Sequence, residues 1–210
     1  MINKVVEENS DIDPDRIIIG GCSNGGYMTM EMVLTYPELF YKAYPICEAF
    51  YDEYITDKQI AAVKAAGTEL WFTYSRDDTT VDPTKCAIPT IERMKEAGIT
   101  VHESTYDHVV DTTGRFTDAN GDPYQYAGHW SWIYFDNNYN VCDDCQENEW
   151  EWLAAYKTTE EPTKTDTTKK NDTKTPSTGI HSNVGLYVGT FFVTMITLAG
   201  VVVIKKKYSK

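Results

Sequence analysis

The sequence predicts an α/β domain, built from parallel strands with covering helices, followed by a disordered linker and one transmembrane helix. Short apolar runs alternate with amphipathic stretches over residues 1–156, which is the pattern of a parallel sheet covered by helices. Charge divides the chain at the same point: residues 1–156 hold 28 acidic and 10 basic side chains, whereas residues 157–210 hold 4 and 9. The first 156 residues are therefore expected to form the globular part.

The composition of the 210-residue chain excludes two broad classes. With 41% hydrophobic and 13% aromatic residues, the chain is too apolar to be wholly disordered. Its net charge of -13 argues against a general nucleic-acid binder, which needs a basic surface to neutralise phosphates. We therefore expect no nucleic acid among its partners.

Strands and helices are expected to alternate along the globular part. An apolar Arg-Ile-Ile-Ile-Gly run is typical of a buried strand, and Gly67 and Gly98 mark expected helix ends. Pro37 closes the first helix because proline cannot continue the hydrogen-bond ladder. The expected strands are 16–20, 41–47, 69–74 and 99–106, and the expected helices are 25–36, 57–66 and 83–97.

The last quarter of the chain is expected to attach the domain to a membrane. Residues 157–183 are rich in Thr, Lys and Pro and have no apolar pattern, so they form a solvated linker. Residues 184–204 carry no charge and reach roughly 30 Å as a helix, the thickness of a bilayer core. The lysines of the tail, 205–210, place the carboxyl terminus on the cytoplasmic side.

A short motif lies between linker and span. Thr175-Pro176-Ser177-Thr178-Gly179, followed by an apolar helix and a basic tail, resembles the sortase-type sorting signal of Gram-positive bacteria, with Thr in place of the usual Leu. The resemblance implies cleavage between Thr178 and Gly179 by a sortase and attachment of Thr178 to peptidoglycan. A plain membrane anchor is the alternative. Either way, the domain is expected to face outward at the cell surface.

The motif with the clearest chemistry is Gly21-Cys22-Ser23-Asn24-Gly25, between an expected strand and an expected helix. In this pattern the serine occupies a tight strand-to-helix turn, and small neighbours let the two elements approach closely. The amides at the start of the helix point to the place where negative charge develops. Ser23 is therefore a candidate nucleophile, and a structural turn with an incidental serine is the alternative.

A nucleophilic serine needs a histidine base and an acid that orients it. The loop after the third expected strand offers three acids, of which one precedes a proline and fits a helix cap: Asp77, Asp78 and Asp82. Among the histidines outside the tail, one lies within a strand, one follows that strand, and one lies in a later loop after a glycine: His102, His108 and His129. Its position in a loop after the last expected strand favours His129 as the base. The alternative is that His129 is simply packed in the interior, as histidines beside aromatic residues often are.

Together these segments resemble the α/β-hydrolases, in the branch of secreted esterases and prolyl-oligopeptidase-like peptidases. The residues that carry the resemblance are 13–17 leading into 21–26, then Asp78-Thr79-Thr80-Val81-Asp82-Pro83, then Gly128-His129-Trp130. The resemblance implies Ser23, Asp78 and His129 as nucleophile, orienting acid and general base, with the amide of Asn24 as an oxyanion donor. It also implies hydrolysis of a carboxylic ester or peptide without cofactor or metal.

The resemblance covers only the C-terminal half of that fold. The early strands, the second oxyanion donor and a signal peptide have no counterpart in the sequence. We therefore expect an N-terminally truncated fragment of a longer secreted precursor, inactive by itself. A wall-displayed binding protein that retains hydrolase motifs is the alternative from another class.

Two further patterns have the spacing of metal sites but lack a complete set of ligands. The Asp-x-Asn-x-Asp spacing of 118–122 superficially suggests calcium, but His129 stands where the bidentate Glu is needed, and Asn120-Gly121 is a strong hairpin signal. Cys142 and Cys145 have the spacing of half a zinc site without a second matching pair, so a local disulfide or reduced thiols are favoured. No metal is predicted.

Overall fold

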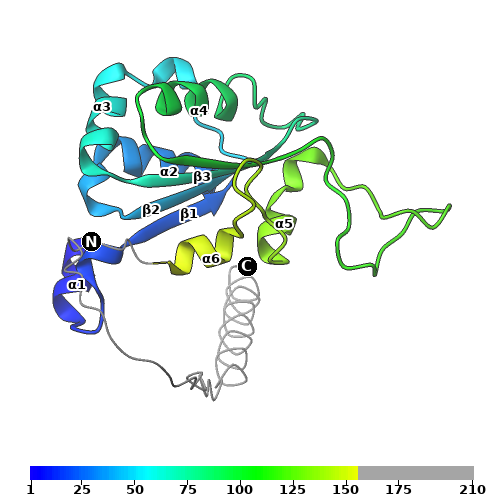
Figure 1. Ribbon diagram of the computed structural model, residues 1–210, viewed down its shortest axis with the longest axis horizontal. Coiled ribbons are helices and arrows are strands. Elements are labelled where there is room, and N and C mark those ends of the chain that lie inside the picture. Colours follow the sequence, from blue (N-terminus) through cyan, green and yellow to red (C-terminus); the bar gives the residue numbers. More distant parts are fainter. Residues whose placement is uncertain (156–210) are drawn as a thin grey trace, which may run out of the picture. The chain divides into compact units, whose positions relative to one another are not determined.

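The computed structural model describes residues 1–155, which fold around one parallel sheet (Figure 1). Its strands are β1 (Ile18–Cys22), β2 (Lys42–Ile46), β3 (Glu69–Ser75) and β4 (Val101–Tyr106), in the order β1-β2-β3-β4. Three helices connect them in turn: α2 (Asn24–Thr35), α3 (Asp57–Ala66) and α4 (Ala87–Glu96). The predicted α/β architecture of parallel strands and covering helices is therefore present.

Alternation along β3 shows how the sheet separates two apolar layers. Leu70, Phe72 and Tyr74 point to one face, where they pack with buried side chains of α2, α3 and α4. Trp71 points to the other face and packs with Phe135 and Trp152, from the short helices α5 (Trp132–Asp136) and α6 (Glu149–Ala154). Both faces of β3 are thus covered, as parallel sheets require, which explains its continuous apolar sequence.

The helix α3 begins and ends where the sequence predicts, for identifiable reasons. Thr56 and Gln59 form a capping box, in which each side chain satisfies the other residue's backbone N–H. Gly67 follows the helix with φ of 74°, a left-handed conformation that glycine adopts without strain.

The helix α4 is shorter than predicted, because it begins at Ala87 and not at residue 83. A helix from residue 83 would place Pro89 in its interior, where proline removes a hydrogen bond and clashes with the preceding turn. In the observed helix Pro89 lies in the first turn, where its missing N–H has no cost. The segment before it forms a turn in which the Asp82 carboxylate accepts hydrogen bonds from the N–H and hydroxyl of Thr84.

Several short elements were not foreseen in the sequence. The helix α1 spans Ile2–Glu8, and it buries none of its side chains fully. α5 and α6 are too short to show a clear apolar period. Short 3-10 turns cover Pro14–Arg16, Pro37–Leu39, Asp52–Tyr54 and Gly128–Trp130.

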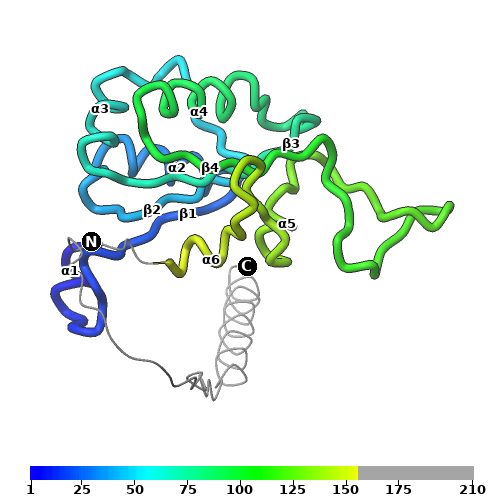
Figure 2. Tube along the Cα trace, viewed as in Figure 1, coloured from blue at the N-terminus to red at the C-terminus, as the bar shows by residue number. Residues whose placement is uncertain are grey.

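Residues 107–127 form a long excursion between β4 and α5, which Figure 2 shows extending away from the sheet. Its two arms pair through antiparallel bridges, Val110 with Gln125 and Thr117 with Pro123, as the hairpin signal predicts. Gly121 has φ of 89° at the tip. The Asp118 carboxylate accepts the amides of Asn120 and Asp122, so it stabilises the turn.

Among residues 1–155, no helix is long and apolar enough to cross a bilayer. Four predicted features lie outside the described residues: the linker (157–183), the sorting motif with Thr178 and Gly179, the transmembrane helix (184–204) and the basic tail (205–210). The predicted domain boundary at residue 156 lies one residue beyond the described part of the chain.

Candidate active site

Ser23 lies on the turn between β1 and α2, with φ of 57° and ψ of -115°. Such a positive φ is strained for a residue with a side chain, and it persists only where the surroundings impose it. The Ser23 N–H donates to the carbonyl of Ile46 at 2.9 Å, which fixes the turn to the end of β2. The strand-turn-helix setting predicted for a nucleophilic serine is thus present.

Two glycines allow this turn to be so tight. A Cβ on Gly21 would lie 2.9 Å from the Cα of Gly25, and a Cβ on Gly26 would lie 2.8 Å from the Cα of Glu48. A Cβ on Gly25 would meet nothing within 4 Å. The close approach of helix and sheet therefore depends on Gly21 and Gly26, whereas the last glycine of the G-x-S-x-G pattern is sterically free.

The three residues named from the resemblance form a continuous relay. The Oγ of Ser23 lies 2.9 Å from Nε2 of His129, and Nδ1 of His129 lies 2.7 Å from Oδ2 of Asp78. They come from the ends of β1 and β3 and from the Gly128–Trp130 turn, up to 106 residues apart. This is the arrangement of a serine nucleophile, its general base and the acid that orients the base.

Asp78 is held rigidly in this relay. Its side chain is 2% exposed, and its Oδ1 accepts the amides of Thr80 at 2.8 Å and Val81 at 2.9 Å. Three hydrogen bonds therefore compensate the burial of the carboxylate. The carboxylate accepts from His129 Nδ1, which leaves Nε2 of the neutral ring to accept the proton of Ser23.

The remaining candidate acids and histidines have other roles. Asp77 binds the Ser75 hydroxyl at 2.6 Å and His108 Nδ1 at 2.8 Å. Burial alone would raise the pKa of Asp77, but the hydrogen bonds from Ser75 and His108 outweigh it and lower that pKa. Asp82 stabilises a turn, as expected for a capping residue. His102 lies within β4, and His108 is paired with Asp77. Neither histidine is hydrogen-bonded to Ser23 or Asp78 in the described part of the chain.

Close packing also fixes the loop that carries the base. A Cβ on Gly128 would lie 2.2 Å from Oδ1 and 2.7 Å from the carbonyl carbon of Asp77. Only glycine lets this loop approach the acid loop closely enough for His129 to reach Asp78. On the other side, the ring of Trp132 meets the His129 imidazole edge-on, with centroids 5.6 Å apart.

Asn24 is the first residue of α2, so its N–H is one of the four amides at a helix start that have no partner within the helix. It directly follows the nucleophile, the position from which an oxyanion donor acts in this class of fold. The positive end of the α2 dipole favours negative charge at the same place.

Sequence reasoning missed a buried acid that lies against Gly26, in the first turn of α2. Glu48 follows β2, is 2% exposed, and accepts the Phe50 amide at 2.6 Å, while its other carboxyl oxygen has no partner. Burial raises the pKa of Glu48 to about 8. Its position at the carboxyl end of a parallel strand, the edge where such sheets place their sites, was the available signal.

The aromatic side chains of residues 124–134 differ in their exposure. Tyr134 is buried and belongs to the core, where its hydroxyl donates to the carbonyl of His108 and accepts the amide of Val110. Tyr124 and Trp130 are 47% and 46% exposed, and Trp130 directly follows His129 in the sequence. Tyr126 and Trp132 are half-buried, so Tyr124 and Trp130 are the more accessible of these rings.

The chain is similar to known hydrolases. The model of the prolyl oligopeptidase family, Peptidase_S9, matches residues 1–72. A thermostable esterase is similar in structure, with 25% identity and a TM-score of 0.53 over 73% of this chain and 34% of that chain. Acylaminoacyl peptidase from Pyrococcus horikoshii is also similar, with 16% identity and a TM-score of 0.41 over 51% of this chain and 22% of that chain. No curated protein matches the sequence.

The fold, the Ser-His-Asp geometry and the first two similarities support an α/β-hydrolase of the serine hydrolase class. The chain spans about a third of the length of the thermostable esterase.

Proposed function

We propose that the chain carries the catalytic residues of a serine hydrolase that cleaves carboxylic esters through an acyl-enzyme. The observation that carries this proposal is the relay from Ser23 through His129 to Asp78, with contacts of 2.9 and 2.7 Å. Such distances are within hydrogen-bond reach for proton transfer from a nucleophile to its base.

The proposed chemical steps follow from these contacts. His129 Nε2 accepts the Ser23 proton as Oγ attacks the substrate carbonyl, and the oxyanion forms opposite the Asn24 amide. The imidazolium, stabilised by Asp78, then gives the proton to the leaving alcohol, and an acyl-Ser23 ester remains. Water repeats the sequence with His129 as base, which releases the acid and restores Ser23. General-base assistance contributes roughly 10²–10⁴-fold in rate, and one oxyanion donor about 10²–10³-fold.

A peptidase is the second candidate, and the match of residues 1–72 to the prolyl oligopeptidase family favours it. The same relay serves both reactions, with an amine replacing the alcohol as leaving group. Comparison of kcat/KM for an aryl ester and for the matched aryl amide distinguishes the two candidates. A comparable value for the amide would favour the peptidase.

Covalent labelling tests the nucleophile. A fluorophosphonate probe is expected to label the complete protein at Ser23, and Ser23→Ala is expected to abolish both labelling and aryl-ester hydrolysis. Thr29→Ala, which removes a hydroxyl that only donates within α2 to the Gly25 carbonyl, is the matched control and should still be labelled. Unchanged hydrolysis by Ser23→Ala would rule out this mechanism and favour a non-catalytic binding protein.

We also propose that the domain is displayed on the surface of a Gram-positive cell. The uncharged run 184–204, the three lysines after it and the sorting motif with Thr178 and Gly179 support this. A sortase would cleave after Thr178 and join it to peptidoglycan. A muralytic enzyme is expected to release the wild-type protein from the cell wall, and deletion of residues 175–179 is expected to abolish this release. If the wild type and the deletion variant are both recovered with the membrane fraction, the segment is a plain membrane anchor.

A further inference from the structure

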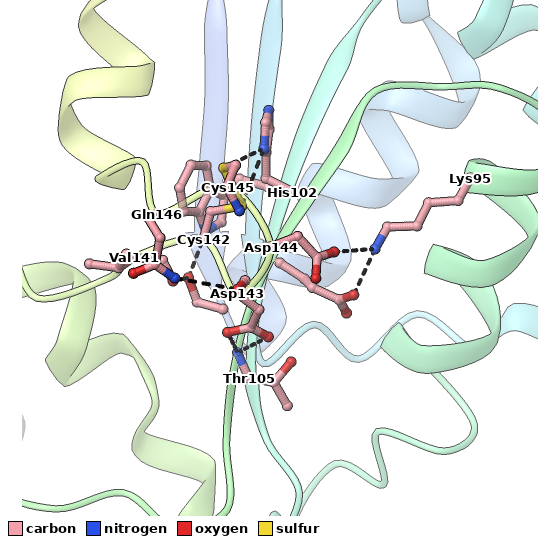
Figure 3. The surroundings of a disulfide bond; sticks show 12 residues. Lys95, His102, Thr105, Val141, Cys142, Asp143, Asp144, Cys145 and Gln146 are labelled. Atoms are coloured by element: carbon pink, nitrogen blue, oxygen red, sulfur yellow. Dashed lines mark hydrogen bonds and ion pairs between the residues drawn. A yellow bond between two sulfur atoms is a disulfide. The ribbon is translucent and has the colours of Figure 1, made fainter.

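Cys142 and Cys145 are joined by a disulfide, one of the two states expected from the sequence (Figure 3). The pair lies in a turn after α5, where the antiparallel bridge between Val141 and Asn148 closes a short loop. His102 of β4 lies against it. Its Nδ1 is 3.5 Å from the sulfur of Cys145 and 3.7 Å from the sulfur of Cys142. Three side chains that commonly bind metals therefore meet at one point.

The imidazole of His102 has a fixed orientation. It stacks on Trp71, with ring centroids 5.1 Å apart, and meets Trp152 edge-on at 5.6 Å. Trp71 is fully buried in the sheet and Trp152 is a core residue of α6. These two contacts fix the plane of the imidazole, and in the structure its Nδ1 faces the two cysteines.

The cysteine turn is also fixed to β4. The Asp143 amide donates to the carbonyl of Glu103 at 2.8 Å, and the Asp143 carboxylate accepts the Thr105 amide at 3.0 and 3.2 Å. Within the turn, the Cys145 amide donates to the sulfur of Cys142 at 3.1 Å. An N–H bond to sulfur stabilises a thiolate, the form in which cysteine binds metals.

These distances suit a tetrahedral ion. With Zn–S of about 2.3 Å and Zn–N of about 2.0–2.1 Å, a tetrahedral zinc separates nitrogen from sulfur by about 3.5–3.6 Å, and sulfur from sulfur by about 3.8 Å. Both nitrogen-sulfur separations of His102 are already close to that value. Only the two sulfurs have to separate, which happens when their bond is reduced.

We propose that His102, Cys142 and Cys145 form a zinc site in the reduced protein, and that the disulfide is its oxidised, metal-free state. Two thiolates and one imidazole are a ligand set that favours zinc over calcium or magnesium. Cys145 is exposed, so water can complete the coordination. The spacing of Cys142 and Cys145 indicates only half of this ligand set, because the third ligand lies 40 residues before Cys142 on β4.

The conversion between the two states balances with a named reductant. A phosphine attacks one sulfur and breaks the S–S bond; water then yields the phosphine oxide and two thiols. The disulfide gains two electrons and the phosphorus loses two. Zinc binding releases two protons from the thiols, and the ion compensates the two negative charges that remain.

The site would hold the C-terminal segment of the domain to the sheet, and it is not catalytic. His102 is the second residue of β4, near its amino end, whereas Ser23 and Asp78 follow the carboxyl ends of β1 and β3. Since the strands are parallel, their amino ends and their carboxyl ends lie on opposite sides of the sheet, so His102 is at the end remote from Ser23 and Asp78. The proposal is therefore independent of the proposed hydrolase activity.

Cobalt titration tests the site directly. The full chain, purified in mild detergent and reduced with a phosphine, is titrated with Co²⁺. One equivalent is expected to give the visible absorption of tetrahedral cobalt with thiolate ligands, and one equivalent of Zn²⁺ should displace it. The oxidised protein should give none of this absorption. Zn²⁺ should also raise the Tm of the reduced protein.

Variants identify the ligands. Cys145→Ser and His102→Phe, which keeps a ring against Trp71, are each expected to weaken Zn²⁺ binding at least about 10-fold in competition with a chromogenic chelator. Cys22→Ser removes an exposed thiol outside the site and should bind as the wild type does. The proposal is overturned if the reduced protein shows no cobalt-thiolate absorption, if the oxidised protein binds equally well, or if His102→Phe binds with unchanged affinity.

Discussion

Asp77 and Asp78 are adjacent in the sequence, but their carboxylates bind different histidines. Asp78 binds His129, which contacts the nucleophile, and Asp77 binds His108, which is exposed. The two contacts are almost equally short, at 2.7 and 2.8 Å. Burial separates them, since the side chain of Asp78 is 2% exposed and that of Asp77 is 30% exposed.

Asp78→Asn is expected to lower kcat for an aryl ester by about 10⁴-fold, because an amide cannot hold the His129 tautomer or stabilise the imidazolium. Asp77→Asn keeps the shape of the side chain and removes the charge that binds His108, while its amide oxygen can still accept the Ser75 hydroxyl. We expect it to change kcat less than 10-fold, roughly the scale of one weak exposed interaction. Steady-state kinetics of both variants of the complete protein make the comparison, and equal losses would contradict the assignment of Asp78.

The nucleophile turn allows a matched pair of glycine substitutions. Gly26→Ala would place a methyl group 2.8 Å from the Cα of Glu48 and 2.9 Å from the carbonyl oxygen of Ile46, neither of which can move alone. We expect a loss of about 1–3 kcal/mol in the free energy of unfolding. Gly25→Ala meets no neighbour and should leave stability unchanged or raise it by about 0.5 kcal/mol. Urea denaturation followed by tryptophan fluorescence measures both.

Local sequence patterns indicated the turn that carries Ser23 but not every limit of the helices. Ser23 and its strand-turn-helix setting follow from local residues, so periodicity and glycine spacing were sufficient. The choice of Asp78 over Asp77 depends on which carboxylate faces His129, a contact across 51 residues. Residues alone left that choice open, and only the resemblance indicated it.

Other features depend on tertiary contacts without a local signal. The helix α4 begins at Ala87, so that Pro89 lies in its first turn. Both Pro83 and Pro89 are visible in the sequence, and proline is common in the first turn of a helix. The sequence therefore indicated two possible starts, and the prediction took the wrong one. Glycine is required at position 26 and not at position 25, because only a side chain at position 26 would collide with Glu48. Glu48 follows another strand, so the sequence around Gly26 does not show this contact. The ring of His102 meets two cysteines because the turn after α5 folds back on β4.

The buried acid Glu48 should make stability depend on pH. Burial raises its pKa from 4.5 to about 8, so between these values the native state keeps a proton that the unfolded state has lost. The contribution of Glu48 is therefore fully present below about pH 4.5 and declines as the pH rises toward about 8. Glu48→Gln cannot ionise and should lack this decline, with a difference of at most several kcal/mol.

The free energy of unfolding of Glu48→Gln relative to wild type should thus increase from about pH 5 to about pH 8. Glu53→Gln, a change at an exposed position five residues further along the chain, is the control and should show a constant difference. A constant difference for Glu48→Gln as well would mean that Glu48 is ionised in the native protein.

Gly128→Ala is expected to reduce activity without unfolding the domain. A methyl group at Gly128 would lie 2.2 Å from Oδ1 of Asp77 and 2.7 Å from its carbonyl carbon and oxygen, so the loop of His129 has to move away from the acid loop. A displacement of about 1 Å is enough to lower the rate about 10²-fold, because the base must meet Ser23 and Asp78 at the same time. The rate of fluorophosphonate labelling of Ser23 and the Tm measure the two effects separately. Ala127→Gly is the control at the preceding position. Wild-type labelling by Gly128→Ala would show that the close approach to Asp77 does not position the base.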